Sequence, residues 1–290
     1  MSYRSVFAPS LFQGQVVVVT GGGSGIGRCT AHELAALGAT VALVGRKADK
    51  LDTVMSEIAA AGGRASAHVC DIREEQAVAD TVSVILAQHG RVDGLVNNAG
   101  GQYPAPLASI NAKGWDAVIR TNLTGGFLMA RECYTQWLQA HGGAIVNIIA
   151  DIWMGMPGMA HSGAARAGML NLTETAALEW APVRLNAVAP GWIASSGMDH
   201  YPPEMGPLIR NMATMVPARR MGTESEVSAA IVFLLSPAAA FISGACLRVD
   251  GAAPNAKRIW PAVGTGGSPT PFDGFHLAST PKVLQAGGNA

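Results

Sequence analysis

Four consecutive valines at residues 16–19, followed by a glycine-rich segment, constrain what this chain can fold into more than any other feature. A β-branched run bounded by glycine predicts a buried central strand of a parallel sheet, because both faces of such a strand are covered. The glycines permit a tight turn with close backbone approach, and a helix is expected over residues 29–37. Free backbone N–H groups at the start of that helix would bind a pyrophosphate. The segment therefore predicts a dinucleotide-binding βα unit rather than a merely flexible loop.

The spacing of the glycines narrows the class of protein. The pattern is Thr-Gly-x-x-x-Gly-x-Gly, not the common G-x-G-x-x-G fingerprint, and it resembles the short-chain dehydrogenase/reductase superfamily. The resemblance implies a set of cofactor-binding residues in this unit: Thr20, Gly21, Gly23, Ser24, Gly25, Ile26 and Gly27.

Strand and helix patterns alternate along the rest of the chain. Further strands are expected at residues 40–45, 64–71, 92–97, 144–149, 184–189 and 246–249. Helices are expected at residues 47–61, 73–89, 113–140, 159–180 and 224–235. This order predicts an α/β fold, a doubly wound (Rossmann) parallel seven-stranded sheet with helices on both faces. We expect an N-terminal arm at 1–13, a single domain at 14–251 and a C-terminal extension at 252–290.

Composition excludes several partners. Lys plus Arg and Asp plus Glu both number 20, so the zero net charge implies no nucleic-acid partner. No apolar stretch approaches membrane-spanning length, so no membrane partner is expected, and no His/Cys cluster predicts a metal. The four cysteines have no paired spacing, which favours a reduced, cytoplasmic protein. Hydrophobic residues at 49% and charged residues at 14% favour buried subunit interfaces, and the family resemblance implies a homotetramer.

Arg46 follows the second expected strand, where an acidic residue would bind the ribose 2′-hydroxyl of NAD(H). No carboxylate stands there to repel a 2′-phosphate, and a guanidinium can grip one with a forked pair of hydrogen bonds. NADP(H) is therefore favoured over NAD(H). The alternative is that Arg46 merely caps a solvated turn.

Further cofactor contacts are implied by the resemblance. Asp71 and Ile72 match the family's adenine contact, although an ordinary helix N-cap is the other interpretation of Asp71. The remaining matches lie after later strands: Asn98, Ala99, Gly100, Pro190, Gly191, Ile193 and Ser195.

The catalytic pattern of the superfamily is broken in this chain. Most members carry Ser, Tyr and Lys, with Tyr-x-x-x-Lys on one helix, where the ammonium lowers the pKa of the phenol. Alignment of the flanking segments places Ser162 where Tyr is expected and Arg166 where Lys is expected. The serine position falls at Ile149 or Ala150, so only Asn122 survives from the usual set.

The replacement pattern resembles the peroxisomal trans-2-enoyl-CoA reductases and their bacterial relatives, with the 2,4-dienoyl-CoA reductases as neighbours. The matching segments are His161-Ser162-Gly163-Ala164-Ala165-Arg166, Asn97-Asn98-Ala99-Gly100-Gly101-Gln102 and Thr121-Asn122-Leu123-Thr124-Gly125. Reduction of a conjugated C=C places negative charge on the carbonyl or thioester oxygen, which Ser162 can stabilise without titrating. Arg166 would hold the nicotinamide ribose. The alternatives are a helix-packing serine and an arginine that satisfies backbone carbonyls.

Protonation of the α-carbon needs a source that the resemblance does not supply. Three candidates are Tyr103 at the mouth of the site, Tyr201 in the substrate lid, and Asp151 after the fifth strand, which would act through water. Each has a purely structural role as its alternative. Residues 198–215, rich in Met and Pro, predict a mobile apolar lid over a hydrophobic substrate.

These observations predict an NADP(H)-dependent reductase for the C=C bond of an α,β-unsaturated acyl-CoA, an enzyme of lipid metabolism. One alternative is a dehydrogenase or carbonyl reductase for an apolar alcohol or aldehyde, such as citronellol or citronellal. Another is a non-catalytic nucleotide-binding scaffold. The extension is expected to be ordered against a neighbouring subunit over residues 260–276, with Phe272 and Phe275 as anchors.

Overall fold

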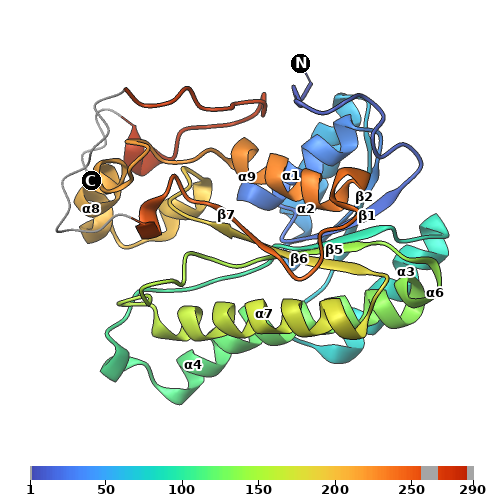
Figure 1. Ribbon diagram of the computed structural model, residues 1–290, viewed down its shortest axis with the longest axis horizontal. Coiled ribbons are helices and arrows are strands. Elements are labelled where there is room, and N and C mark those ends of the chain that lie inside the picture. Colours follow the sequence, from blue (N-terminus) through green and yellow to red (C-terminus); the bar gives the residue numbers. More distant parts are fainter. Residues whose placement is uncertain (1, 256–266, 286–290) are drawn as a thin grey trace.

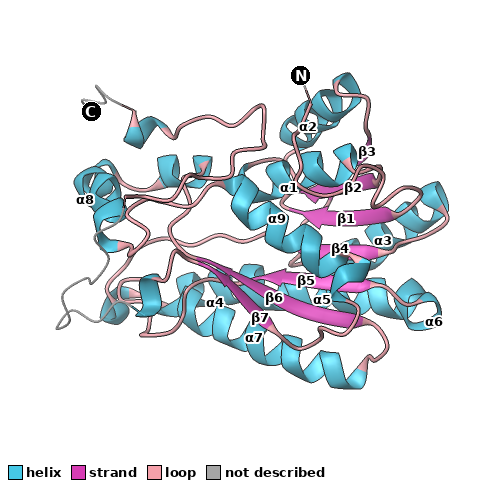
Figure 2. Ribbon diagram, turned by 45° about the horizontal axis from the view of Figure 1, so that its top comes forward, coloured by secondary structure: helices cyan, strands magenta, loops and turns pink. Residues whose placement is uncertain are grey.

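The computed structural model describes residues 2–255 and 267–285 of the chain. Its centre is a seven-stranded, all-parallel sheet with the strand order β3-β2-β1-β4-β5-β6-β7 (Figure 2). The strands are β1 Val16–Thr20, β2 Thr40–Gly45, β3 Arg64–Val69, β4 Gly94–Asn97, β5 Ala144–Ile148, β6 Arg184–Pro190 and β7 Cys246–Val249. The predicted doubly wound fold is confirmed.

The valines of β1 alternate between two cores, one on each face of the sheet. Val17 and Val19 pack with the helices α1, α2 and α9, whereas Val16 and Val18 pack with α3 and α5. All of β1 is buried, as expected for a strand covered on both sides. Figure 1 shows α1, α2 and α9 above the sheet and α4 and α7 below it.

The helices follow the predicted order with small shifts at their ends. They are α1 Gly25–Ala36, α2 Ala48–Ala60, α3 Glu75–His89, α4 Ala112–Ile119, α5 Gly125–Cys133, α6 Gln139–His141, α7 Ala160–Glu179, α8 Gly206–Asn211 and α9 Glu224–Leu235. The single helix expected at 113–140 is a continuous helical stretch with two π segments, Arg120–Thr124 and Tyr134–Leu138. The first π segment contains Asn122 and is a bulge of the kind found at functional sites.

Both predicted anchors of the C-terminal extension, Phe272 and Phe275, pack within the same chain, and order of the extension against a neighbouring subunit stays a prediction. Phe275 is buried against Tyr3 of the N-terminal arm and Cys29 of α1, with Phe272 beside it. The Arg4 N–H donates to the Gly274 carbonyl at 2.9 Å, and Ser225 Oγ accepts from the Phe275 N–H at 3.1 Å. Sequence reasoning treated the core as complete at residue 251 and overlooked the apolar surface that the N-terminal arm supplies. Trp260 lies outside the described residues.

Beyond Phe275 the extension reaches the segment predicted to be a lid. The short 3-10 helix Lys282–Leu284 packs against α8, and Val283 and Leu284 join a cluster with Met198, Ile209 and Met212 (Figure 1). The Val283 N–H donates to the Asp199 carboxylate at 3.2 Å. The extension thus connects the N-terminal arm with the lid.

Among the described residues, no helix combines the length and apolar character needed to cross a membrane. The four cysteines are free.

Candidate active site

The glycine-rich turn is fixed to the end of the neighbouring strand β4. Thr20 is fully buried, and its hydroxyl accepts the N–H groups of Asn98 and Ala99 at 3.0 Å each. The Asn98 side chain donates to the Thr20 carbonyl at 3.0 Å. Gly27 lies so close to the Gly21 carbonyl oxygen that a Cβ would collide with it. The turn is therefore held in shape before any cofactor binds.

The N-terminus of α1 is free of local capping groups. Ser24 is its N-cap residue with extended backbone, and its side chain makes no cap hydrogen bond. No acidic residue stands in the first turn. Unpaired N–H groups at a helix N-terminus attract an anion, so this end of α1 fits the pyrophosphate of a dinucleotide.

One carboxyl group lies beside this anion site. Glu224 Oε1 lies next to Gly25, the first residue of α1, and a methyl side chain at Gly25 would be 3.8 Å from that oxygen. Burial raises the pKa of Glu224 to about 7, while the Arg28 charge and a hydrogen bond from the Ser196 backbone oppose that rise. Sequence reasoning missed Glu224, because only the fold brings the start of α9 next to the start of α1.

Arg46 is exposed at the end of β2 and within electrostatic reach of Asp71. Hydrogen bonds from Arg73 lower the pKa of Asp71 to about 2, so Asp71 is ionised at neutral pH. The interpretation of Asp71 as a helix N-cap is wrong, because the N-cap residue of α3 is Glu74. Asp71 instead accepts the Arg73 N–H at 3.1 Å and orders the turn before that helix. The buried Ile72 packs against the backbone of Gly125.

Buried Asn122 and half-buried Arg166 are bonded to each other at the centre of the site. Arg166 Nη2 donates to Asn122 Oδ1 at 3.0 Å, and Arg166 Nη1 donates to the Ile148 carbonyl at 2.5 Å. The Asn122 amide also brackets Gly101, accepting its N–H at 3.0 Å and donating to its carbonyl at 2.6 Å. Burial lowers the pKa of Arg166 to about 10, so the guanidinium is still charged at neutral pH. Its Nε is buried without a hydrogen-bond partner.

Ser162 lies one helical turn before Arg166 on α7, and its hydroxyl is not free. It is fully buried, and its Oγ–H donates to Gln102 Oε1 at 2.7 Å. Gln102 Nε2 in turn donates to the Tyr201 hydroxyl oxygen at 2.9 Å. Gln102 belongs to one of the matching segments, and no role was predicted for it from the sequence. Its polar side chain directly after that segment's glycines was the available sign of a site residue.

His161 directly precedes Ser162 on α7 and is buried. Its Nδ1 accepts the Ser162 N–H at 3.0 Å, so the ring proton belongs on Nε2, which is buried and without a hydrogen-bond partner. The ring of Tyr103 meets that of His161 edge to face, with centroids 4.7 Å apart. The Tyr103 hydroxyl lies over Gly114 in the first turn of α4, and the side chain is 40% exposed. The Tyr103 hydroxyl thus points to α4, and a place for Tyr103 at the mouth of the site stays a prediction.

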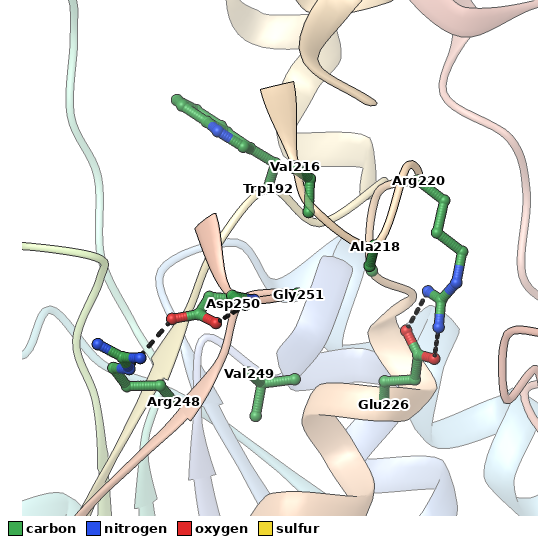
Figure 3. Close-up of a pocket in the computed structure, with 11 residues that line it drawn as sticks. Trp192, Val216, Ala218, Arg220, Glu226, Arg248, Val249, Asp250 and Gly251 are labelled. Atoms are coloured by element: carbon green, nitrogen blue, oxygen red, sulfur yellow. Dashed lines mark hydrogen bonds and ion pairs between the residues drawn. The ribbon is translucent and has the colours of Figure 1, made fainter. Parts of the chain in front are cut away.

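Asp151 lies toward β7. Burial and the charge of Asp250 raise its pKa, and the Trp153 N–H and the Arg248 charge oppose that rise. A cavity of about 400 Å³ lies nearby, between the end of β7 and residues 216–222. Figure 3 shows two ion pairs in its lining, Asp250 with Arg248 and Arg220 with Glu226. The structure thus groups Asn122, Ser162 and Arg166 and sets Asp151 beside a separate charged cluster.

The segment after β6 runs beside the end of β7, and its predicted cofactor contacts stay predictions. Gly191 lies against Asp250, and its N–H donates to the Val249 carbonyl after Pro190 ends β6. Ile193 is buried and bridges Gly222, and Ser195 begins the 3-10 helix Ser196–His200. Exposed apolar side chains lie on the segments that follow β4, β5 and β6, and together they are called the apolar rim: Tyr103, Leu107, Met154, Trp192, Leu208 and Met215.

The described part of the chain holds no group of three or more His, Cys, Asp and Glu side chains that could bind a metal ion.

Comparison with known proteins gives consistent matches over most of the chain. The family model described as Enoyl-(Acyl carrier protein) reductase matches residues 21–252. A Bacillus subtilis protein named probable 2,4-dienoyl-CoA reductase is 36% identical, over 82% of this chain and 95% of its own length. A Danio rerio peroxisomal 2,4-dienoyl-CoA reductase is 33% identical, over 87% of this chain and 85% of its own.

A solved structure from Pseudomonas aeruginosa, described as a citronellol catabolism dehydrogenase, is 60% identical with a TM-score of 0.79. The match covers 87% of this chain and 100% of that one. All of that chain is therefore matched, while part of the present chain has no counterpart in it.

Proposed function

This chain belongs to the short-chain dehydrogenase/reductase family, and from that premise we propose an NADP(H)-dependent reductase for the C=C bond of an α,β-unsaturated acyl-CoA. The proposal rests above all on one arrangement, the pair of buried Asn122 and half-buried Arg166 next to buried Ser162. None of these three side chains is a base near neutral pH, so they are poorly suited to removing a hydroxyl proton. They are well suited to stabilising a negatively charged oxygen by hydrogen bonds.

The residues present fit a dinucleotide. The uncapped start of α1 would hold the pyrophosphate, exposed Arg46 would pair with a 2′-phosphate, and Arg166 would hold the nicotinamide ribose. A bound nicotinamide would supply a hydride to the β-carbon of the substrate, and the α-carbon would take a proton from solvent water. Asn122 fixes Gly101 and Arg166, so that the floor of the site does not reorganise during the reaction.

Ser162 supplies the hydrogen bond to the substrate. Its hydroxyl donates to the thioester oxygen on which negative charge develops, and the full burial of this side chain strengthens that bond. The apolar rim and the Met-rich lid suit an acyl chain. The relatives named 2,4-dienoyl-CoA reductases support the same reaction type.

A dehydrogenase or carbonyl reductase for an apolar alcohol or aldehyde is the second candidate. It is favoured by the structure described as a citronellol catabolism dehydrogenase, which is 60% identical to this chain. The same apolar rim would accept a branched terpenoid chain. This candidate requires a base that Ser162, Asn122 and Arg166 do not provide.

The decisive experiment measures NADPH oxidation with crotonyl-CoA, decenoyl-CoA, 2,4-decadienoyl-CoA, citral and citronellal in parallel, and NADP⁺ reduction with citronellol. Turnover of the thioesters, lost in Ser162→Ala with NADPH affinity retained, is the expected result. Turnover confined to citronellol and the aldehydes would establish the second candidate. NADPH binding without turnover of any of these compounds would favour a nucleotide-binding scaffold.

A further inference from the structure

Ser162 has one hydroxyl hydrogen, and in this structure that hydrogen is donated to Gln102 Oε1 rather than toward a substrate. A hydroxyl that must stabilise a developing negative charge has to direct the same hydrogen at the substrate oxygen. Something must therefore release Ser162 from Gln102 when the site is ready to react.

Gln102 is placed to make that release depend on the lid. Its Oε1 contacts Ser162, and its Nε2 donates at 2.9 Å to the hydroxyl oxygen of Tyr201. Tyr201 packs in the lid cluster with Met198, Ile209 and Met212. The backbone before Gln102 is fixed, because the Asn122 amide holds both the N–H and the carbonyl of Gly101. Only the side chain of Gln102 is thus left to move between the helix α7 and the lid.

Turning the carboxamide of Gln102 by half a rotation exchanges its donor and its acceptor. Nε2 would then donate to Ser162 Oγ, and the Tyr201 hydroxyl would donate to Oε1. The hydrogen of Ser162 would become free for the substrate oxygen. Each bond in such a chain polarises the next, which strengthens the final donor.

We propose that Gln102 is a positioning residue that couples the lid, through Tyr201, to the hydrogen-bond donor Ser162. The proposal rests on the proposed function in one respect, since it takes Ser162 to donate to a substrate carbonyl oxygen. It applies equally to a thioester and to a conjugated aldehyde, because both present that oxygen.

The first test compares turnover in four variants, with Gln102→Met and Tyr201→Phe removing the two hydrogen-bonding ends of the link. Each should lower kcat about tenfold, which corresponds to one ordinary hydrogen bond, with the Kd of NADPH unchanged within about twofold. The double variant should be no slower than either single variant, because both remove the same coupling. Gln76→Met, at an exposed glutamine on α3, is the matched control and should leave kcat unchanged.

The second test uses pH. In Gln102→Glu a carboxylate can only accept, so it holds the Ser162 hydrogen, whereas the protonated acid can again donate to Ser162. The variant should therefore lose activity as the pH rises through the pKa of the new side chain and regain it at lower pH. A role in folding alone would not produce this titration.

The third test needs no substrate. Hydrogen exchange of residues 196–215 in the NADPH complex should be faster in Gln102→Met and Tyr201→Phe than in wild type or Gln76→Met. If wild type turns over no thioester or aldehyde but this exchange responds, the proposed function fails and the link to the lid stands. Full kcat in Gln102→Met, additive losses in the double variant, or lid exchange equal to wild type would each overturn the proposal.

Discussion

Arg166 Nη2 lies 3.0 Å from Asn122 Oδ1, so the residue in the usual lysine position is bonded directly to the residue that brackets Gly101. Both interpretations of Arg166 drawn from the sequence describe the same side chain. It satisfies a backbone carbonyl through Nη1 and holds the floor of the site through Nη2. The bond to the Ile148 carbonyl is the structural role, and the contact of Arg166 with the nicotinamide ribose stays a prediction.

Arg166→Ala should raise the KM for NADPH more than it lowers kcat, because the ribose loses its contact while Ser162 remains. Asn122→Ala should mainly lower kcat, since Gly101 and Gln102 lose their anchor. Steady-state kinetics with varied cofactor separate the two. An unchanged cofactor KM in Arg166→Ala would contradict the role proposed for the guanidinium.

Arg46→Ala should weaken NADPH binding by about 1.5–3 kcal/mol, the contribution of a hydrogen bond to a charged group, and leave NADH almost unaffected. The side chain is exposed, so its removal should not disturb the fold. Fluorescence titration with both cofactors measures the difference, and Lys47→Ala is the neighbouring control. Equal losses for the two cofactors would place the 2′-phosphate elsewhere.

Glu224 should make cofactor binding depend on pH. Burial raises its pKa from 4.5 to about 7, so the carboxyl group becomes charged beside the pyrophosphate site only as the pH rises through about 7. The charges that face it are Arg28 and Asp273. NADPH affinity should therefore fall above that pH in wild type and fall less in Glu224→Gln. Parallel pH profiles for the two proteins would show that Glu224 does not contribute.

The raised pKa of Glu224 also predicts how the free energy of unfolding changes with pH. An acid whose pKa is higher in the folded state binds its proton more tightly there than in the unfolded chain. Its contribution is fully present below about 4.5 and is lost as the pH rises to about 7. Relative to wild type, Glu224→Gln should thus gain stability at the upper end of this window, measured by urea unfolding at several pH values.

Phe275→Ala should destabilise the protein by about 3–5 kcal/mol, because the ring is 3% exposed and fills the space between the N-terminal arm and α1. A fall in Tm of about 10 °C is the corresponding observation. Phe241→Ala, at a fully exposed ring, is the matched control and should change stability by less than about 0.5 kcal/mol. Truncation after Gly251 should in addition raise the substrate KM, since it removes Val283 and Leu284 from the lid cluster.

The homotetramer remains a prediction that assembly measurements can test. Leu178 on α7 is 84% exposed, on a helix expected to pair across a two-fold axis. Leu178→Glu should shift the protein to a lower oligomeric state in light scattering. Val84→Glu, at an exposed valine on α3, should leave assembly unchanged. A monomeric wild type at micromolar concentration would overturn the prediction.

Patterns along the sequence predicted the strands and helices whose formation depends on neighbouring residues. The valine run, the glycine spacing and the alternation of apolar periods predicted a parallel sheet, and the bounds of β2, β7 and α9 agree with the expected ranges. The two π segments between residues 120 and 138 were not predicted, because a one-residue bulge leaves the apolar period of a long helix almost unchanged.

The sequence by itself determined the fold, the glycine-rich turn and the replacement of Tyr and Lys by Ser162 and Arg166, because each depends on residues that are close together along the chain. Only the tertiary structure decided that Glu224 stands beside Gly25, that Phe275 packs on Tyr3, and that Gln102 joins Ser162 to Tyr201. These pairs are separated by tens to hundreds of residues, and their contacts depend on how loops from different strands converge at one edge of the sheet. Side-chain hydrogen bonds act over about 3 Å, so no pattern along the chain can specify them until the fold has brought the partners together.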